Sequence, residues 1–272
     1  MRIEYLGGDE PEIAIIGGIH GDEPCGVNAI EHILAEEPDL ERPVAFIIAN
    51  EKALAANERY LEEDLNRIFP GDPEGETHES RLAAKLVDEV KDCLTFSMHS
   101  TQSYSEMFAL VKELREFSRE ICSRLSVDAV VDVGKHDKGR LFESVNKVIE
   151  IECGYQGSAE ATQNAIQVTY EFLGAVGALP SHRRRPQRNL PLFRLGKPVP
   201  KERASTYEVY ASNFEAVEPG EPFAAVENEQ IIADEGFYPV LMSPYGYENL
   251  FGYTAERIGT VEPLNAEESA ES

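Results

Sequence analysis

The chain has 272 residues, 42% of them hydrophobic, so it can bury a core in one large domain or in one domain with a smaller partner. Its 50 Asp and Glu residues outweigh 25 Lys and Arg, which gives a formal net charge of -25. Nucleic acids and anionic membranes are bound through positive charge, so this composition excludes both as expected partners. The composition does not determine the oligomeric state, and a homo-oligomer is one possibility.

The acidity has two interpretations, a merely soluble surface or a halophilic protein from a cytoplasm of very high salt. Only nine of the basic residues are lysine, which favours the halophilic interpretation. The N-terminus has no apolar signal core and no stretch approaches 18 apolar residues, so we expect a soluble, cytoplasmic protein. The four cysteines form no CxxC pair and are expected to be free, buried thiols: Cys25, Cys93, Cys122 and Cys153.

Up to about residue 178, short apolar runs alternate with amphipathic helical patterns. This alternation predicts an α/β domain over residues 1–180, with a largely parallel or mixed sheet. Ser158 is the expected N-cap of the last helix. The predicted strands cover 12–18, 44–50, 94–100, 107–111, 129–134 and 147–154, and the predicted helices cover 80–93, 113–125 and 158–179.

The character of the chain then changes. Residues 181–203 are rich in proline and arginine and are predicted to be a linker, although the arginines could also form an anion funnel. Short strand-like runs separated by turn signals predict a small β-rich domain over 204–262. Residues 263–272 are predicted to be an acidic, disordered tail.

A metal site is suggested by the octet "GGIHGDEP", residues 17–24, which follows the buried run "IAII". Zinc hydrolases use three protein ligands, usually His with Asp or Glu, and keep one position open. His20 and Glu23 supply two of them at HxxE spacing. His99, at the end of another predicted strand, is the best candidate for the third, because strand ends of α/β sheets converge.

Two further segments carry chemistry. The stretch 57–72, "NERYLEEDLNRIFPGD", offers Arg59, Asp64, Asn66 and Arg67 with little apolar content, and arginine with asparagine suits carboxylate recognition. A surface salt-bridge loop is the alternative. In "VIEIECG" the alternation puts Glu150 and Glu152 on one face of a strand, either as a general base or as part of a polar sheet face.

Taken together, "GGIHGDEP", "DLNRIF" with the Pro-Gly loop after it, the later strand-ending histidine and "IEIECG" resemble the succinylglutamate desuccinylase and aspartoacylase family. These enzymes are relatives of the zinc carboxypeptidases. "PGEPF" and "YPVLMSPYGYENLF" resemble the C-terminal lid of the family, so the resemblance spans about residues 10–255. It implies a zinc-carboxypeptidase-like domain with a mixed central sheet flanked by helices, 1–180, and a small β-rich lid domain, 204–262.

The resemblance also implies a role for individual residues. One Zn²⁺ would be held by His20, Glu23 and His99. Glu152 would be the general base, and Arg59 would polarise the amide carbonyl. The substrate would be held by Asn66, Arg67 and Tyr247, with Arg140 binding a second carboxylate and Tyr245 as a rival of Tyr247.

These residues predict a zinc-dependent hydrolase that removes the acyl group from a small, anionic N-acylamino acid. A zinc metallocarboxypeptidase and a non-catalytic zinc-binding regulatory protein are the alternatives. The family usually has Asp two residues before the third ligand and Asn just after it, whereas this chain has Ser97 and Ser100. The change affects the expected orientation of the zinc-bound histidine and leaves the acyl group and amino acid open.

Overall fold

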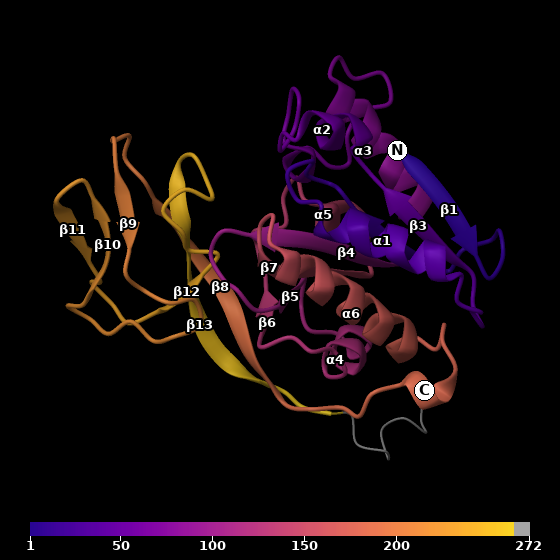
Figure 1. The fold of residues 1–272 in the computed structure, drawn as a ribbon. Helices are drawn as coiled ribbons and strands as arrows, with labels where there is room; N and C mark the ends of the chain where they lie inside the picture. Colours follow the sequence, from indigo (N-terminus) through magenta and orange to yellow (C-terminus); the bar gives the residue numbers. More distant parts are fainter. Residues whose placement is uncertain (264–272) are drawn as a thin grey trace.

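The computed structural model describes residues 1–263, which fold around one large mixed β-sheet (Figure 1). Its ten strands lie in the order β1-β3-β2-β4-β7-β5-β6-β8-β13-β12. A second sheet has the order β11-β10-β9. The strands of the large sheet are β1 (Arg2–Leu6), β2 (Ile13–Gly17), β3 (Val44–Ile48), β4 (Leu94–Thr101), β5 (Phe108–Val111), β6 (Val130–Asp132), β7 (Val148–Tyr155), β8 (Leu190–Pro200), β12 (Tyr238–Val240) and β13 (Leu250–Val261).

Helices cover both faces of the parallel centre of this sheet, which is why the strands there are apolar on both faces. Ile13 and Ile15 of β2 face one hydrophobic layer, and Ala14 and Ile16 face the other. The first layer contains α1 (Cys25–Glu36), α4 (Glu116–Cys122) and α6 (Ala159–Ala175). The second contains α3 (His78–Val90), α5 (Leu141–Ser144) and the short helix η1 (Leu65–Arg67), with α2 (Glu51–Ala56) beside them.

The sequence-based expectation of an α/β fold with a mixed sheet is confirmed. Each of the six predicted strands lies in the large sheet, and β1 is an additional strand that pairs antiparallel with β3. The Ser158 side chain caps α6 by accepting a hydrogen bond from the Ala161 N–H at 3.0 Å, as predicted. All four cysteines are buried and free. The predicted acidic tail, apart from Pro263, lies outside the described residues.

Residues 181–203, predicted to be a linker, contain a short helix and a long strand. A short helix, η2 (Ser181–Arg183), is followed by β8, which pairs with β6 on one side and β13 on the other. Its pairing with β6 covers only residues 192–194. Pro198 and Pro200 lie beyond that stretch, where one side of β8 has no neighbouring strand and a missing N–H breaks no ladder.

The C-terminal part of the chain forms a lobe, residues 201–249, to which the long strands β8 and β13 lead from the main body (Figure 1). This β-lobe contains β12 and the small antiparallel sheet of β9 (Tyr207–Val209), β10 (Pro222–Val226) and β11 (Glu229–Ile232). Asn213 fastens it to the main body, because its Nδ2 donates to the Ser103 carbonyl at 2.7 Å and its Oδ1 accepts from Met242 N.

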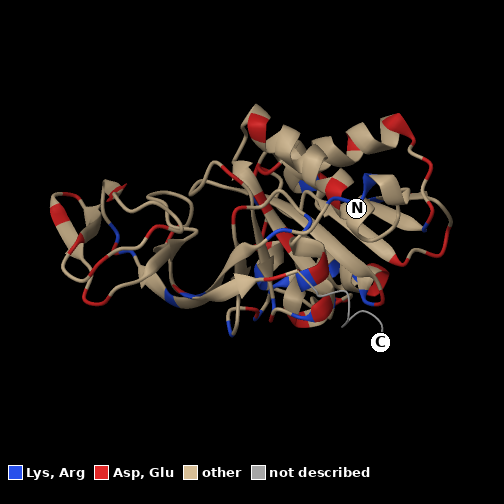
Figure 2. Ribbon diagram, turned by 90° about the horizontal axis from the view of Figure 1, so that it is seen from below, with Lys and Arg blue, Asp and Glu red and all other residues tan. Residues whose placement is uncertain are grey.

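Acidic residues are spread over both the main body and the β-lobe (Figure 2). The Asp and Glu residues far outnumber the cations around them, as the net charge of -25 requires. Among the described residues, no helix is both long and apolar enough to cross a membrane.

Candidate metal centre and adjoining pocket

The candidate site lies at the carboxyl ends of three neighbouring strands, β2, β4 and β7. β2 is parallel to β4 with Ile16 opposite Ser97, and β4 is parallel to β7 with His99 opposite Glu152. His20 follows β2 within three residues of its end. The sheet therefore brings the HxxE turn, His99 and Glu152 to one place, as the strand-end argument predicted.

The turn after β2 depends on a glycine at position 21. A Cβ atom there would lie 2.1 Å from the backbone carbon of Ala53, so no other residue lets the turn pass so close to α2. The Gly21 N–H donates to the Arg59 carbonyl, which joins this turn to the 57–72 segment. As a result, the HxxE turn and the "DLNR" loop form two adjoining walls of the site.

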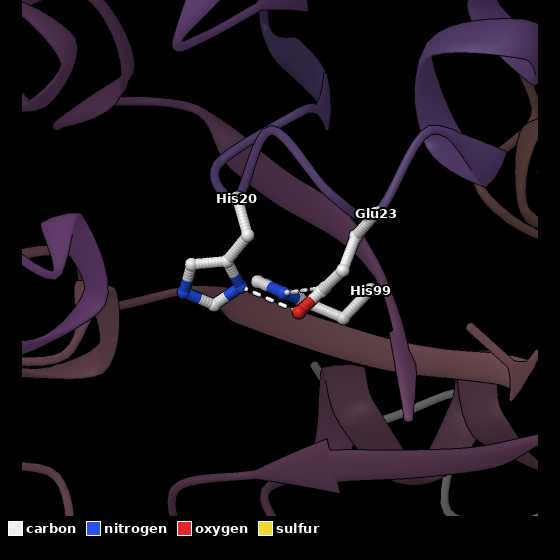
Figure 3. Close-up of side chains that lie close together, drawn as sticks. All are labelled: His20, Glu23 and His99. Carbon is white, nitrogen blue, oxygen red and sulfur yellow. Dashed lines mark hydrogen bonds and ion pairs between the residues drawn. The ribbon is translucent and has the colours of Figure 1, made fainter. Parts of the chain in front are cut away.

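Three side chains point toward one another at the centre of the site (Figure 3). His20 Nδ1 lies 2.8 Å from Glu23 Oε1, and His99 Nδ1 lies 3.1 Å from Glu23 Oε2. One ligand atom from each residue falls within 4.8 Å of the others, and all three side chains are buried. Both histidines thus turn the same nitrogen, Nδ1, toward the Glu23 carboxylate.

The outer nitrogens of the two histidines have unlike partners. Nε2 of His20 lies 3.2 Å from Asp64 Oδ1, whereas Nε2 of His99 lies 3.3 Å from the Ser97 hydroxyl. Position 97 therefore orients His99, but with a neutral group. From the sequence, Asp64 is one of the polar residues of the 57–72 loop, with no role of its own. The fold brings it to His20, which lies 44 positions earlier in the chain.

Arg59 lies over the metal triad and is held by two carboxylates. Its Nη1 donates to Glu23 Oε1 at 3.0 Å, and its Nε donates to Asp64 Oδ2 at 3.1 Å. Burial opposes the positive charge, but Glu23 and Asp64 raise the pKa of Arg59 above its usual value. Burial also disfavours a charged Asp64, yet His20 and Arg59 hold its pKa far below the usual range. Arg59 is accordingly a fixed cation beside the triad.

Glu150 and Glu152 of β7 both face the pocket, as their alternation predicted. In the described part of the chain, one carboxylate oxygen of each is buried without a hydrogen-bond partner. Burial raises the pKa of Glu152 to about 7, and the negative charges of Glu23 and Glu150 act in the same direction against the attraction of His99. A carboxyl group with a pKa near neutrality can both take up and release a proton.

Opposite the triad lie residues suited to an anion. The Leu141 N–H donates to Asn66 Oδ1 at 3.2 Å, which ties the "DLNR" loop to the start of α5. Gly139 makes this approach possible, since a Cβ there would lie 2.1 Å from the Arg67 carbonyl oxygen. Arg140 is only 6% exposed. Within residues 1–263, neither Arg67 nor Arg140 has a carboxylate in ion-pair contact.

The β-lobe closes the pocket with Tyr247 rather than Tyr245. Tyr247 lines the pocket, while Tyr245 is 58% exposed and its hydroxyl accepts from Tyr207 N. Burial raises the pKa of Tyr247 to about 12, so it keeps its proton and can donate a hydrogen bond. The enclosed space is about 50 Å³, and every site residue predicted from the sequence borders it: His20, Glu23, Arg59, Asn66, Arg67, His99, Arg140, Glu152 and Tyr247.

The chemistry of the triad fits a zinc ion. Two neutral imidazoles and one carboxylate are ligands that catalytic zinc uses together with an open position. Burial would lower the pKa of His99, but the hydrogen bond and charge of Glu23 raise it to about 9, so this place favours positive charge. Glu150 and Glu152 add two more carboxylates to the same pocket. The residues present therefore suit a divalent cation.

Comparison with known proteins gives a consistent family. Residues 9–179 match the sequence profile of the succinylglutamate desuccinylase/aspartoacylase catalytic domain. A probable aspartoacylase of Nostoc sp. is 27% identical over 273 residues, which cover 86% of this chain and 92% of that protein. A succinylglutamate desuccinylase of Pseudomonas paraeruginosa is 32% identical over 131 residues, 42% of this chain and 40% of that protein. The crystal structure of a succinylglutamate desuccinylase/aspartoacylase from Rhodobacter sphaeroides superimposes with a TM-score of 0.73, over 94% of this chain and 89% of that one, at 18% identity.

Proposed function

Because the chain belongs to the succinylglutamate desuccinylase/aspartoacylase family of zinc-dependent amidohydrolases, we propose that it removes the acyl group from a small, anionic N-acylamino acid. The observation that carries this proposal is one pocket with two unlike ends. A metal triad and an unpaired carboxylate, Glu152, form one end. Arginines without ion-pair partners among the described residues, Arg67 and Arg140, form the other.

The anion-binding end supports a substrate with a free carboxylate. A buried guanidinium with no carboxylate in ion-pair contact has lost much of its hydration, and a bound carboxylate would compensate through paired hydrogen bonds. Arg140 is the buried cation here, and Arg67 with Asn66 adds donors at the edge of the pocket. Tyr247, with its proton retained, can donate a further hydrogen bond to the same group. We assign these four residues to the amino-acid half of the substrate.

The catalytic end supports hydrolysis of the amide. A zinc ion held by His20, Glu23 and His99 would polarise the carbonyl and acidify the attacking water. Glu152, a buried carboxylate that borders the same pocket, would accept a proton from the attacking water and return it to the leaving amine. Arg59, fixed by Glu23 and Asp64, places a positive charge where the carbonyl oxygen becomes negative.

A substrate panel tests this function. The protein, loaded with zinc, should hydrolyse N-acetyl-L-aspartate or a related N-acylamino acid faster than a peptide with a free C-terminus. Preferred cleavage of the peptide would instead identify a metallocarboxypeptidase. Stoichiometric zinc without turnover of any substrate would identify a non-catalytic zinc-binding protein. We further propose that this chemistry takes place in a cytoplasm of high salt, on the strength of the net charge of -25.

A further inference from the structure

The pocket around the triad is too small for a whole substrate. Its volume is about 50 Å³, far below the roughly 300 Å³ at which small-molecule sites usually begin. An N-acylamino acid contains many more atoms than such a space can enclose. With the carboxylate at Arg67 and Arg140 and the amide at the triad, the acyl group must extend beyond the pocket.

A larger hollow adjoins the pocket at the junction of main body and β-lobe. We call it the tyrosine groove, after Tyr104, Tyr155 and Tyr210, which line it. Its volume is about 600 Å³, within the range of small-molecule binding sites. Gln102 and Ser243 border both the groove and the pocket, so the two spaces lie side by side. The groove is therefore where a substrate continues beyond the triad.

The groove and the pocket differ in charge. Three arginines border the pocket. Among residues 1–263, neither arginine nor lysine borders the groove, and Glu215 is the one charged residue that lines it. Asp128 adds negative charge behind it, since the Tyr104 hydroxyl donates to Asp128 Oδ2 at 2.9 Å. A carboxylate on the acyl group would lose hydration there without gaining a cation, which is unfavourable.

Aromatic surface in the groove is available to a ligand. Tyr155 is 49% exposed and Tyr210 is 47% exposed, although large apolar side chains usually bury more of their area. The walls do not need to form on binding, because Asn213 already joins Ser103 to Met242 across the groove. A flat, uncharged ring could therefore cover exposed tyrosine surface in a preformed site.

We propose that the tyrosine groove binds the acyl group of the substrate and selects one that is uncharged and larger than acetyl, with an aromatic acyl group as the best fit. This inference rests on the proposed deacylase function and specifies its substrate class. Acyl groups that end in a carboxylate, such as succinyl, are disfavoured, and the carboxylates of the amino-acid half remain at Arg67 and Arg140.

The test compares kcat/KM for N-benzoyl-, N-acetyl- and N-succinyl-L-aspartate with the zinc-loaded full-length protein. We expect the benzoyl compound to exceed the succinyl compound by at least about tenfold, because only the latter brings a second negative charge to the groove. If succinyl equals or exceeds benzoyl, the groove assignment is overturned while the deacylase proposal stands. If no compound is hydrolysed, both are overturned.

A charge-reversal variant locates the effect in the groove. Glu215→Lys should lower the ratio of benzoyl to succinyl kcat/KM by about tenfold, and Glu215→Gln should lower it less. Glu229→Lys makes the same change of charge at an exposed position of β11 outside the groove and serves as the matched control. If the ratio of benzoyl to succinyl kcat/KM is the same in Glu215→Lys and Glu229→Lys, the groove does not bind the acyl group.

Discussion

The Asp64 carboxylate lies 3.2 Å from the outer nitrogen of His20 and at the same time accepts a hydrogen bond from Arg59 Nε at 3.1 Å. One side chain thus orients a candidate metal ligand and the cation beside it. His99 has only the Ser97 hydroxyl in the corresponding place. The two histidines of the triad are therefore held by partners of different charge, and this difference predicts unequal sensitivity to substitution.

Replacing Asp64 with Asn should weaken zinc binding by about 10- to 100-fold, the usual effect of losing a carboxylate behind a histidine ligand. Competition with a chromogenic chelator measures the affinity. Glu58→Gln is the matched control, because it removes the same charge from an exposed position of the same loop. Equal zinc affinities for the two variants would rule out this role of Asp64.

Lys201 positions the loop that carries Tyr247. Its ammonium group donates to the carbonyls of Pro244 and Tyr247 and lies 4.5 Å from the centre of the Tyr207 ring, and the residue is only 9% exposed. Lys201→Met removes both hydrogen bonds, so the loop should loosen and KM should rise by about tenfold, with a smaller change in kcat. Lys197→Met, at an exposed position of β8, provides the comparison. An unchanged KM in Lys201→Met would contradict this role.

The raised pKa of Glu152 predicts a pH dependence of stability in the metal-free protein. Because the folded-state pKa is about 7 and the ordinary value is 4.5, this group stabilises the fold fully below about pH 4.5 and loses that contribution as pH rises to 7. The loss amounts to at most about 3 kcal/mol. Glu152→Gln has no carboxyl group at this position that could titrate. Its free energy of unfolding, measured by urea titration, should therefore rise relative to that of wild type between pH 4.5 and 7. If the stabilities of wild type and Glu152→Gln change with pH in parallel, Glu152 does not titrate with a raised pKa.

The charge of -25 predicts a strong dependence on salt. Repulsion between carboxylates is screened within about 3 Å at 1 M salt, so the melting temperature should rise steadily as sodium chloride increases to molar concentrations. Sucrose at equal osmolality is the control, since it is excluded from protein surfaces without screening charge. If salt raises the melting temperature no more than sucrose does, the halophilic interpretation fails.

Much of the fold could be predicted from the sequence because its strands are apolar on both faces and short. Runs such as residues 44–48 have few other interpretations. β8 was missed because its prolines and arginines resemble a linker. Its hydrogen-bonding partners lie about 60 positions away in the sequence, β6 before it and β13 after it. Local pattern contains no information about such distant pairing.

The same limit applies to the site. The ligand types and spacing in "GGIHGDEP" and His99 could be predicted from the sequence, since the turn follows one buried strand and His99 lies near the end of another. The contact between Asp64 and His20, and the support of Tyr247 by Lys201, depend on tertiary structure alone. The charge difference between pocket and groove likewise requires the β-lobe to be in place.

The central claim is that Glu152 transfers the proton in a zinc-dependent deacylation. The most direct measurement is the turnover of an N-acyl-L-aspartate by Glu152→Gln, together with the zinc content of the same sample. We predict one zinc ion per chain, as in wild type, and a kcat reduced by at least about 100-fold. A variant with full zinc and a wild-type rate would contradict the account.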